Sequence, residues 1–130
     1  MSTIYDLIVI GGGPGGIGAA VEAKVLGLQN ILLIEKSDNH SHTIRKFYKD
    51  NKRVEKDWQG QAVELEGSVE FVDGTKESTL DYFDSLLDDD AIDSRFNCEV
   101  EKVEKCDGVF EVTTNCGDRK STRLNSSHRL

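Results

Sequence analysis

Two short, wholly apolar runs near the N-terminus are separated by a glycine-rich turn and a helix-like stretch. Residues 5–10 have a continuous apolar core and residues 31–34 are all Ile or Leu, which is typical of parallel strands covered on both faces. Between them, apolar residues recur at helical spacing from Pro14 to about Leu26, and Gly27 is placed to end the helix. The order strand, helix, strand over about 30 residues predicts a right-handed crossover between parallel strands.

The middle of the chain predicts a hairpin and then a helix. Residues 62–65 and 68–72 have the pattern of short strands, and Asp73 with Gly74 predicts a turn after them. Ser78 or Thr79 is the expected N-cap of the helix that follows. The apolar stripe of this helix consists of Leu80, Phe83, Leu86 and Leu87.

Three further strands are predicted in the C-terminal half of the chain. They cover residues 92–96, 99–104 and 109–113, and a turn at Asp107 and Gly108 joins the last two. Residues 88–90 are all Asp, and we expect them beyond the preceding helix because acids at a helix C-terminus oppose its dipole. Together these elements predict an α/β fold in which a parallel sheet is combined with a β-meander.

Composition and charge narrow the class of protein. The 130 residues suit one domain, and the formal charge of -8 argues against a nucleic-acid partner. No apolar run approaches the ~20 residues of a membrane span, so we expect no membrane contact. The N-terminus lacks the features of a secretory signal, which favours a cytoplasmic location.

The cysteines and histidines predict no metal site. Cys98, Cys106 and Cys116 match neither a zinc pattern nor a C-x-x-C motif, and we expect free, reduced thiols. His40 and His42 fall in a polar stretch without a ligand partner at metal spacing, so a solvated loop is expected.

A basic segment interrupts the acidic chain between residues 43 and 57. It holds six Lys or Arg and three acids, and Phe47, Tyr48 and Trp58 lie within or beside it. The segment could lie near anionic phosphates or a nicotinamide cofactor. The ordinary behaviour of charged faces favours a solvated amphipathic helix whose aromatic side chains complete the core.

The glycine-rich turn carries the clearest chemistry. Gly11, Gly13 and Gly16 fit G-x-G-x-x-G, which allows a sharp turn, close approach of a pyrophosphate, and close packing of helix on strand. The N-terminus of the following helix offers N–H donors to the pyrophosphate. Glu35 stands at the end of the second strand, 24 residues after Gly11. A carboxylate at this position accepts hydrogen bonds from ribose hydroxyls and repels a 2′-phosphate. This favours FAD or NAD over NADP.

Residues 5–20 and 31–36 resemble the N-terminus of flavoproteins with two dinucleotide-binding domains. They are most similar to thioredoxin reductase-like pyridine nucleotide-disulfide oxidoreductases. The resemblance implies a Rossmann-like FAD-binding domain whose first glycine motif holds the ADP half of FAD. By matching position, the glycine turn would hold the pyrophosphate and Glu35 would hold the ribose. Lys36 would flank the adenosine, and the backbone of Val100 would contact the adenine. The implied turn residues are Gly11, Gly13, Pro14, Gly15 and Gly16.

The resemblance also implies an activity for the intact protein. In such an oxidoreductase, a hydride passes from NAD(P)H to FAD and on to an acceptor, which can be a disulfide or a redox partner protein, and the intact enzyme can be a homodimer. Two rivals stay open: another enzyme that starts with the same turn (a flavin-dependent monooxygenase or an NAD-dependent dehydrogenase), and a non-enzymatic nucleotide-binding module. No residue is assigned a catalytic role.

The C-terminal residues predict an incomplete domain. Residues 118–128 show no strand or helix period and resemble the in-frame translation of a common short-read sequencing adapter. We therefore expect residues 118–130 to be a non-native, disordered tail. Residues 1–117 would be the N-terminal part of a truncated FAD/NAD(P)-binding domain. The NAD(P)H motif, the redox C-x-x-C and the late Gly-Asp motif of the family would then lie in the missing part, and the fragment would be inactive and bind FAD poorly.

Overall fold

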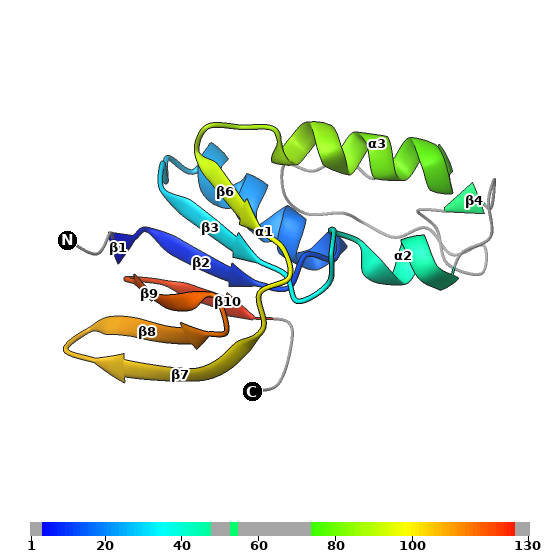
Figure 1. Ribbon diagram of the computed structural model, residues 1–130. Helices are drawn as coiled ribbons and strands as arrows, with labels where there is room; N and C mark the ends of the chain where they lie inside the picture. Colours follow the sequence, from blue (N-terminus) through cyan, green and yellow to red (C-terminus); the bar gives the residue numbers. More distant parts are fainter. Residues whose placement is uncertain (1–3, 48–52, 55–73, 127–130) are drawn as a thin grey trace, which may run out of the picture.

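A four-stranded parallel sheet forms the centre of the computed structural model, which describes residues 4–47, 53–54 and 74–126 (Figure 1). Its strand order is β10-β2-β3-β6, and all neighbouring strands are parallel. The strands are β2 (Leu7–Ile10), β3 (Ile31–Ile34), β6 (Ile92–Arg95) and β10 (Leu124–Ser126). Every residue of β2 and β3 is buried, as their wholly apolar sequences predict.

Two helices pack on one face of this sheet. α1 (Pro14–Val25) connects β2 to β3, and α3 (Lys76–Leu87) precedes β6. Gly27 has φ +105°, and Leu28 N–H donates to the Ala23 carbonyl at 3.0 Å, so α1 ends as the sequence predicts. The core on this face includes Val9, Ile17, Ala20, Leu33, Leu80 and Phe83.

An antiparallel meander covers the opposite face of the sheet (Figure 1). It consists of β7 (Val100–Cys106), β8 (Val109–Thr114) and β9 (Gly117–Ser121), with β1 (Ile4–Tyr5) pairing parallel to β9. The core between the two sheets contains Ile8, Ile10, Leu32, Ile34, Cys98 and Val112. The three layers confirm the predicted α/β fold with a parallel sheet and a β-meander.

α3 begins earlier than expected. Its N-cap is Thr75, whose Oγ1 accepts the Ser78 N–H at 3.2 Å, while Ser78 Oγ accepts the Thr75 N–H at 2.9 Å. The expectation of a cap at Ser78 or Thr79 is therefore wrong, because Ser78 is the reciprocal member of the capping box at the third helical position. Residues 88–90 lie beyond the last turn, as predicted.

The region between β3 and α3 is described only in part. It contains α2 (His42–Phe47), β4 (Arg53–Val54) and β5 (Gly74–Thr75), and the last two pair antiparallel. The hairpin expected at residues 62–72 and most of the basic segment lie outside the described residues. Within the described ranges, no helix is long and apolar enough to cross a membrane.

Strands occupy much of the stretch expected to be disordered. Beyond the turn at Thr114 and Gly117, β9 pairs with β8, and β10 then pairs with β2. The expectation of disorder is wrong for residues 118–126, because ladder hydrogen bonds join backbone groups and need no apolar side chains. The non-native origin of these residues and the domain boundary at residue 117 stay predictions.

The thiol expectation is wrong for two of the three cysteines. Cys98 and Cys116 form a disulfide, with their Cα atoms 5.7 Å apart, whereas Cys106 is free and exposed. Cys98 lies just before β7 and Cys116 just after β8. The antiparallel pairing of Val100 with Thr114 therefore brings the two cysteines together, which their spacing in the sequence does not reveal.

Candidate dinucleotide site

The glycine turn lies at the carboxyl end of β2, where it bends the chain into α1. Gly11 has φ +109°, a conformation that favours glycine, and its N–H donates to the Ile34 carbonyl at 2.8 Å. A Cβ added at Gly16 would lie 1.9 Å from the Gly11 carbonyl oxygen. Gly11 therefore makes the sharp turn, and Gly16 allows the close packing of helix on strand, as the sequence predicts.

Gly13 and Gly15 differ from these two glycines in their surroundings. A Cβ added at either position would meet no atom within 4 Å, so the packing of the chain does not require glycine there. Gly13 is the N-cap of α1, and the first turn of this helix contains no acidic residue. The free N–H groups and the positive dipole end of such a turn favour an anion.

A cavity of about 250 Å³ lies beside the turn. It is lined by Gly13, Pro14, Glu35, Lys36, Ser37, Ser41, His42 and Ile44. The fold thus brings four of the predicted residues to one site, at the carboxyl ends of β2 and β3. This is the edge of an open α/β sheet at which ligands bind. The space beside Gly13 and the absence of an acid from the first helical turn both fit a dinucleotide pyrophosphate.

Val100 does not belong to this cavity. It begins β7, pairs with Thr114 and packs against the core between the two sheets. Its predicted backbone contact with adenine stays a prediction. The residues that the sequence analysis missed are Ser37, Ser41, His42 and Ile44. They follow Glu35 within ten residues, and their position just after a parallel strand was the available signal.

Glu35 is a buried carboxylate that ties the site together. Its Oε1 accepts the Gly12 N–H at 2.8 Å, and its Oε2 accepts the Ser37 N–H at 2.6 Å. The side chain therefore fastens the glycine turn to the loop after β3, a role that the motif alone did not suggest. An ionised carboxylate offers about four acceptor positions, so one carboxylate can accept hydrogen bonds from several groups at once.

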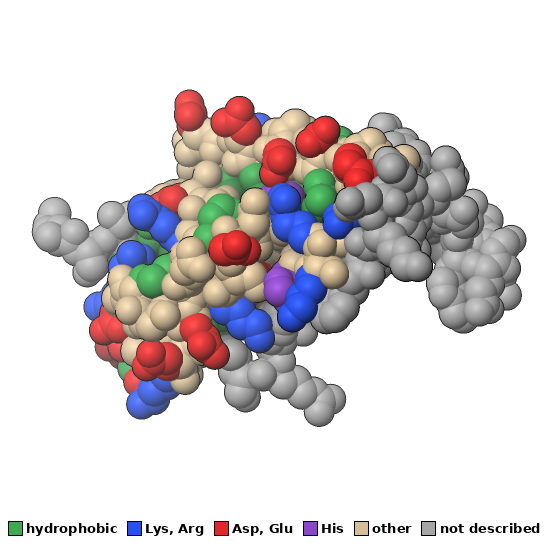
Figure 2. Space-filling view, turned by 45° about the vertical axis from the view of Figure 1, so that its right-hand side comes forward, with side chains coloured by type: hydrophobic (Ala, Val, Ile, Leu, Met, Phe, Trp, Pro, Cys, Tyr) green, Lys and Arg blue, Asp and Glu red, His purple; other side chains and the backbone are tan. Residues whose placement is uncertain are grey.

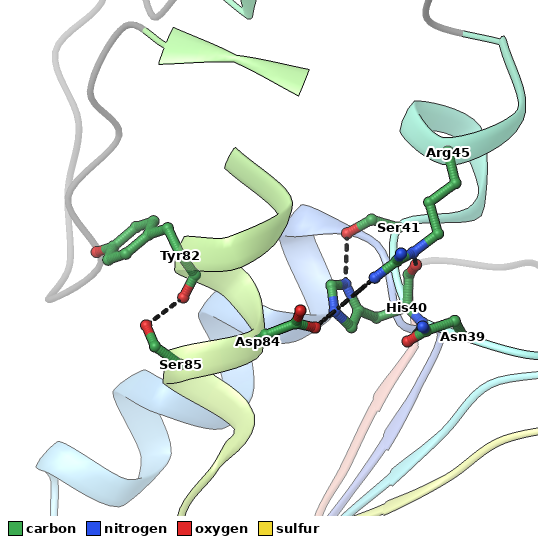
Figure 3. Close-up of polar contacts among 7 residues, drawn as sticks. All are labelled: Asn39, His40, Ser41, Arg45, Tyr82, Asp84 and Ser85. Atoms are coloured by element: carbon green, nitrogen blue, oxygen red, sulfur yellow. Dashed lines mark hydrogen bonds and ion pairs between the residues drawn. The ribbon is translucent and has the colours of Figure 1, made fainter. Parts of the chain in front are cut away.

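The loop after β3 contributes the buried residues His40 and Ser41 to a polar cluster whose other members lie on α2 and α3 (Figure 3). His40 is 2% exposed, its Nδ1 lies 2.9 Å from Ser41 Oγ, and its Nε2 contacts an Asp84 carboxylate oxygen on α3. Arg45 Nε donates to the His40 carbonyl at 2.8 Å. The expectation of a solvated loop is therefore wrong for His40, because α3 supplies a carboxylate partner from 44 residues away. His42 is exposed and lines the cavity.

Basic side chains belong to both the cavity and the His40 cluster. Lys36 lines the cavity, and Arg45 bonds to His40. Figure 2 shows Lys and Arg side chains around a histidine near the centre of this face, while acidic side chains lie along the top and at the lower left. A basic group beside a glycine turn favours an anionic ligand.

One group of potential metal ligands lies elsewhere. Glu104, Cys106 and Glu111 on the β7–β8 hairpin place ligand atoms within 4.8 Å of one another. Lys102 pairs with Glu104 and Lys120 with Glu111, so both carboxylates already face a cation. We therefore do not assign a metal to this group.

Comparisons with known proteins agree with the fold described above. The family model for pyridine nucleotide-disulphide oxidoreductases matches residues 8–125. Thioredoxin reductase from Ureaplasma parvum serovar 3 is 54% identical over 33 residues, which are 25% of this chain and 10% of that protein. The structure of bacillithiol disulfide reductase Bdr from Staphylococcus aureus matches with a TM-score of 0.74 and 25% identity, over 99% of this chain and 39% of that one.

A more distant likeness concerns the fold alone. An oxidised steroid monooxygenase bound to NADP matches with a TM-score of 0.70 and 19% identity, over 96% of this chain and 26% of that one. These likenesses confirm the predicted Rossmann-like fold. In each case the chain spans well under half the length of the protein that it matches.

Proposed function

Because this chain belongs to the pyridine nucleotide-disulphide oxidoreductase family, we propose that it is the FAD-binding part of an NAD(P)H-dependent flavin oxidoreductase. The observation that carries the proposal is the cavity that joins Gly13 and Pro14 of the glycine turn to Glu35 and Lys36 at the end of β3. When bound, the flavin supplies the capacity to accept and pass on a hydride, and the protein binds and orients it.

The chain's own residues would divide the work of holding the ADP half. The backbone of the turn at Gly11, Gly13, Gly15 and Gly16 would surround the pyrophosphate, at the positive end of α1. Glu35 would accept the ribose hydroxyls, Lys36 would flank the adenosine, and the backbone of Val100 would meet the adenine. The buried Glu35 carboxylate would repel a 2′-phosphate, which favours FAD or NAD over NADP at this site.

The reaction of a longer protein containing this chain forms the second part of the proposal. A hydride would pass from NAD(P)H to FAD and then to a disulfide or a redox partner protein. The names of the similar proteins, thioredoxin reductase and bacillithiol disulfide reductase, support a disulfide acceptor. The nicotinamide motif and the redox cysteine pair would lie in the remainder of that protein. A cytoplasmic location and a homodimer complete the proposal.

A flavin-dependent monooxygenase is the second candidate, because a steroid monooxygenase has a similar fold. The sequence of a longer protein separates the two: a redox cysteine pair following a second glycine motif favours the disulfide reductase. A longer protein containing this chain would purify without yellow flavin if it were an NAD-dependent dehydrogenase or a module without enzymatic activity, whereas our proposal requires that the longer protein retain the flavin.

A binding experiment tests the site itself. FAD is titrated into the 130-residue chain and its Gly13→Ala and Gly18→Ala variants, and binding is followed by NMR of the backbone amides. Both substitutions enter open space, so both variants should fold, but only the Gly13 methyl group borders the cavity. We expect binding weaker than micromolar, because the chain spans only 39% of the similar bacillithiol disulfide reductase. We expect still weaker binding by Gly13→Ala and unchanged binding by Gly18→Ala. Equal binding by the two variants would contradict the proposal, and micromolar affinity would contradict the expected weakness.

A further inference from the structure

Residues 96–99 connect β6 in the parallel sheet to β7 in the meander, and they are bonded to one wall of the cavity (Figure 1). Asn97 N–H donates to the Ser37 carbonyl at 2.9 Å, and Cys98 N–H donates to the Glu35 carbonyl at 3.1 Å. Glu35 and Ser37 both line the cavity. The connection therefore supports the backbone of the loop that forms this wall.

The Cys98–Cys116 disulfide fixes the same connection to the turn between β8 and β9. Asn97, next to Cys98, has φ +55°, an uncommon conformation for a residue other than glycine. Glu99 is held separately, because its N–H donates to Asn115 Oδ1 at 2.9 Å and its carbonyl accepts the Asn115 N–H at 3.2 Å. Reduction of the disulfide therefore leaves Glu99 bonded to the turn, while Asn97 and Cys98 lose the covalent bond that fixes them.

The two cysteines of the disulfide differ in exposure. Cys116 is exposed, whereas Cys98 is 7% exposed and belongs to the core between the sheets. A thiolate from solvent therefore reaches Cys116 first, and exposed disulfides are the labile ones. In the cytoplasmic location that we propose, disulfides are usually transient or redox-sensing. Both points favour a disulfide that opens and closes over a permanent one.

We propose that Cys98–Cys116 is a thiol–disulfide exchange site that controls the affinity of the dinucleotide site, and that its reductant is a dithiol. One thiolate of the dithiol attacks Cys116 Sγ, so that a mixed disulfide forms and Cys98 leaves as a thiolate. The second thiolate of the dithiol then attacks the reductant's own sulfur in the mixed disulfide, and Cys116 leaves. The protein gains two electrons and, from solvent, two protons, while the dithiol becomes a disulfide. The inference rests on the proposed FAD site.

Reduction acts on the cavity through Glu35. In the oxidised chain its carbonyl accepts the Cys98 N–H, and its carboxylate accepts the N–H groups of Gly12 and Ser37 at 2.8 and 2.6 Å. When Cys98 and Asn97 are released, the loop that contains Glu35 loses backbone support, and its position relative to the glycine turn is less fixed. A site that must be ordered on binding holds its ligand more weakly. We therefore expect the oxidised chain to bind FAD more tightly than the reduced chain.

Amide hydrogen exchange and FAD titration test the inference on the oxidised 130-residue chain and on the chain reduced with dithiothreitol. A thiol assay should count one free thiol before reduction and three after it. Four amides report on the link between disulfide and cavity: those of Gly12, Ser37, Asn97 and Cys98. Reduction should lower their protection, while the amides of β2 and β3 keep theirs. We expect the Kd for FAD to rise about two- to tenfold, the contribution of one hydrogen bond.

Cys116→Ser and Cys106→Ser are matched variants, because each replaces an exposed cysteine. Cys116→Ser should show the exchange and the affinity of the reduced chain without any dithiothreitol, and it should not respond to the reagent. Cys106→Ser should behave like the unmodified chain in both states. A response of Cys116→Ser to dithiothreitol, or loss of the response in Cys106→Ser, would assign the effect to something other than this disulfide.

The remaining outcomes separate this inference from the FAD site. Three free thiols after treatment with oxidised dithiothreitol would overturn the inference, because no disulfide would then form. A loss of protection that extends over β2 and β3 would also overturn it, since the disulfide would then stabilise the whole fold and not the cavity wall. FAD binding that responds to Gly13→Ala but not to reduction refutes this inference alone, whereas no FAD binding in either state also refutes the FAD site.

Discussion

The packing of α1 on β2 depends on the absence of one side chain, and Gly16→Ala tests it directly. The added Cβ would lie 1.9 Å from the Gly11 carbonyl oxygen, 3.1 Å from its carbon and 3.3 Å from Val9 Cγ1. Gly11 cannot readily yield, because its φ is +109° and its N–H is bound to the Ile34 carbonyl. The helix must therefore move away from the strand.

The size of that movement determines the loss in the free energy of unfolding. Relieving the contact with the Gly11 oxygen to an ordinary ~3.2 Å needs a shift of about 1.3 Å, which loosens Ile17, Ala20 and Val21 in the core. Overpacking of this kind costs about 1–3 kcal/mol, and the better helix propensity of Ala returns at most about 1 kcal/mol. We expect a net loss of about 1–2 kcal/mol in the free energy of unfolding.

Gly18→Ala is the matched control, because it lies in the same helix and its Cβ would meet no atom within 4 Å. We expect it to raise stability by about 0.5–1 kcal/mol through helix propensity alone. Urea denaturation followed by circular dichroism gives both values, provided that the slope with urea is unchanged. Equal stability of the two variants would refute the argument from close approach.

Three further predictions concern features outside the glycine turn. Thr75→Ala should lower stability by about 1 kcal/mol in the same assay, because it removes the capping box of α3, whereas Ser85→Ala in the last turn of that helix should have little effect. Reduction of the Cys98–Cys116 disulfide, which spans 18 residues, should lower the free energy of unfolding by about 3 kcal/mol, and Cys106→Ser should not. The pKa of Asp89 is held below its ordinary value of 3.8 by the hydrogen bond from Lys24, and further by the Ala91 N–H. Its contribution to stability is thus present above pH 3.8 and lost as the pH falls through the lowered pKa, so Asp89→Asn should flatten the acid limb of a plot of stability against pH.

Local patterns of the sequence predicted the central elements well. The apolar runs of β2 and β3 and the Gly27 stop of α1 depend on residues within one element or its next turn. The same holds for the turn at Asp107 and Gly108, both of which have positive φ. In each case the residues that decide the conformation are close neighbours in the sequence. The apolar periodicity and the positions of the glycines were therefore sufficient to predict these elements.

The features that the sequence could not predict depend on contacts between distant segments. His40 is buried because Asp84 reaches it from α3, and Cys98 pairs with Cys116 because β7 and β8 align their ends. Ser41 joins the site through its hydrogen bond to Gly12, which precedes α1 in the sequence, whereas Ser41 follows β3. None of these partners lies at a spacing that a motif records, so only the packed fold brings them together.

The C-terminal stretch is where the local sequence pattern differs most from the fold, and Leu124→Ala tests the packing that the structure shows. β10 is a largely polar strand at the edge of the parallel sheet, and it contributes Leu124 to the core between the sheets. Because β10 pairs with β2, truncating this half-buried leucine should lower the free energy of unfolding by about 1–2 kcal/mol, roughly half the loss for a fully buried one. The control Leu26→Ala, at a side chain that is 77% exposed, should cost almost nothing. A loss confined to Leu124→Ala would support the place of β10 beside β2, and equal unfolding midpoints for the two variants would contradict it.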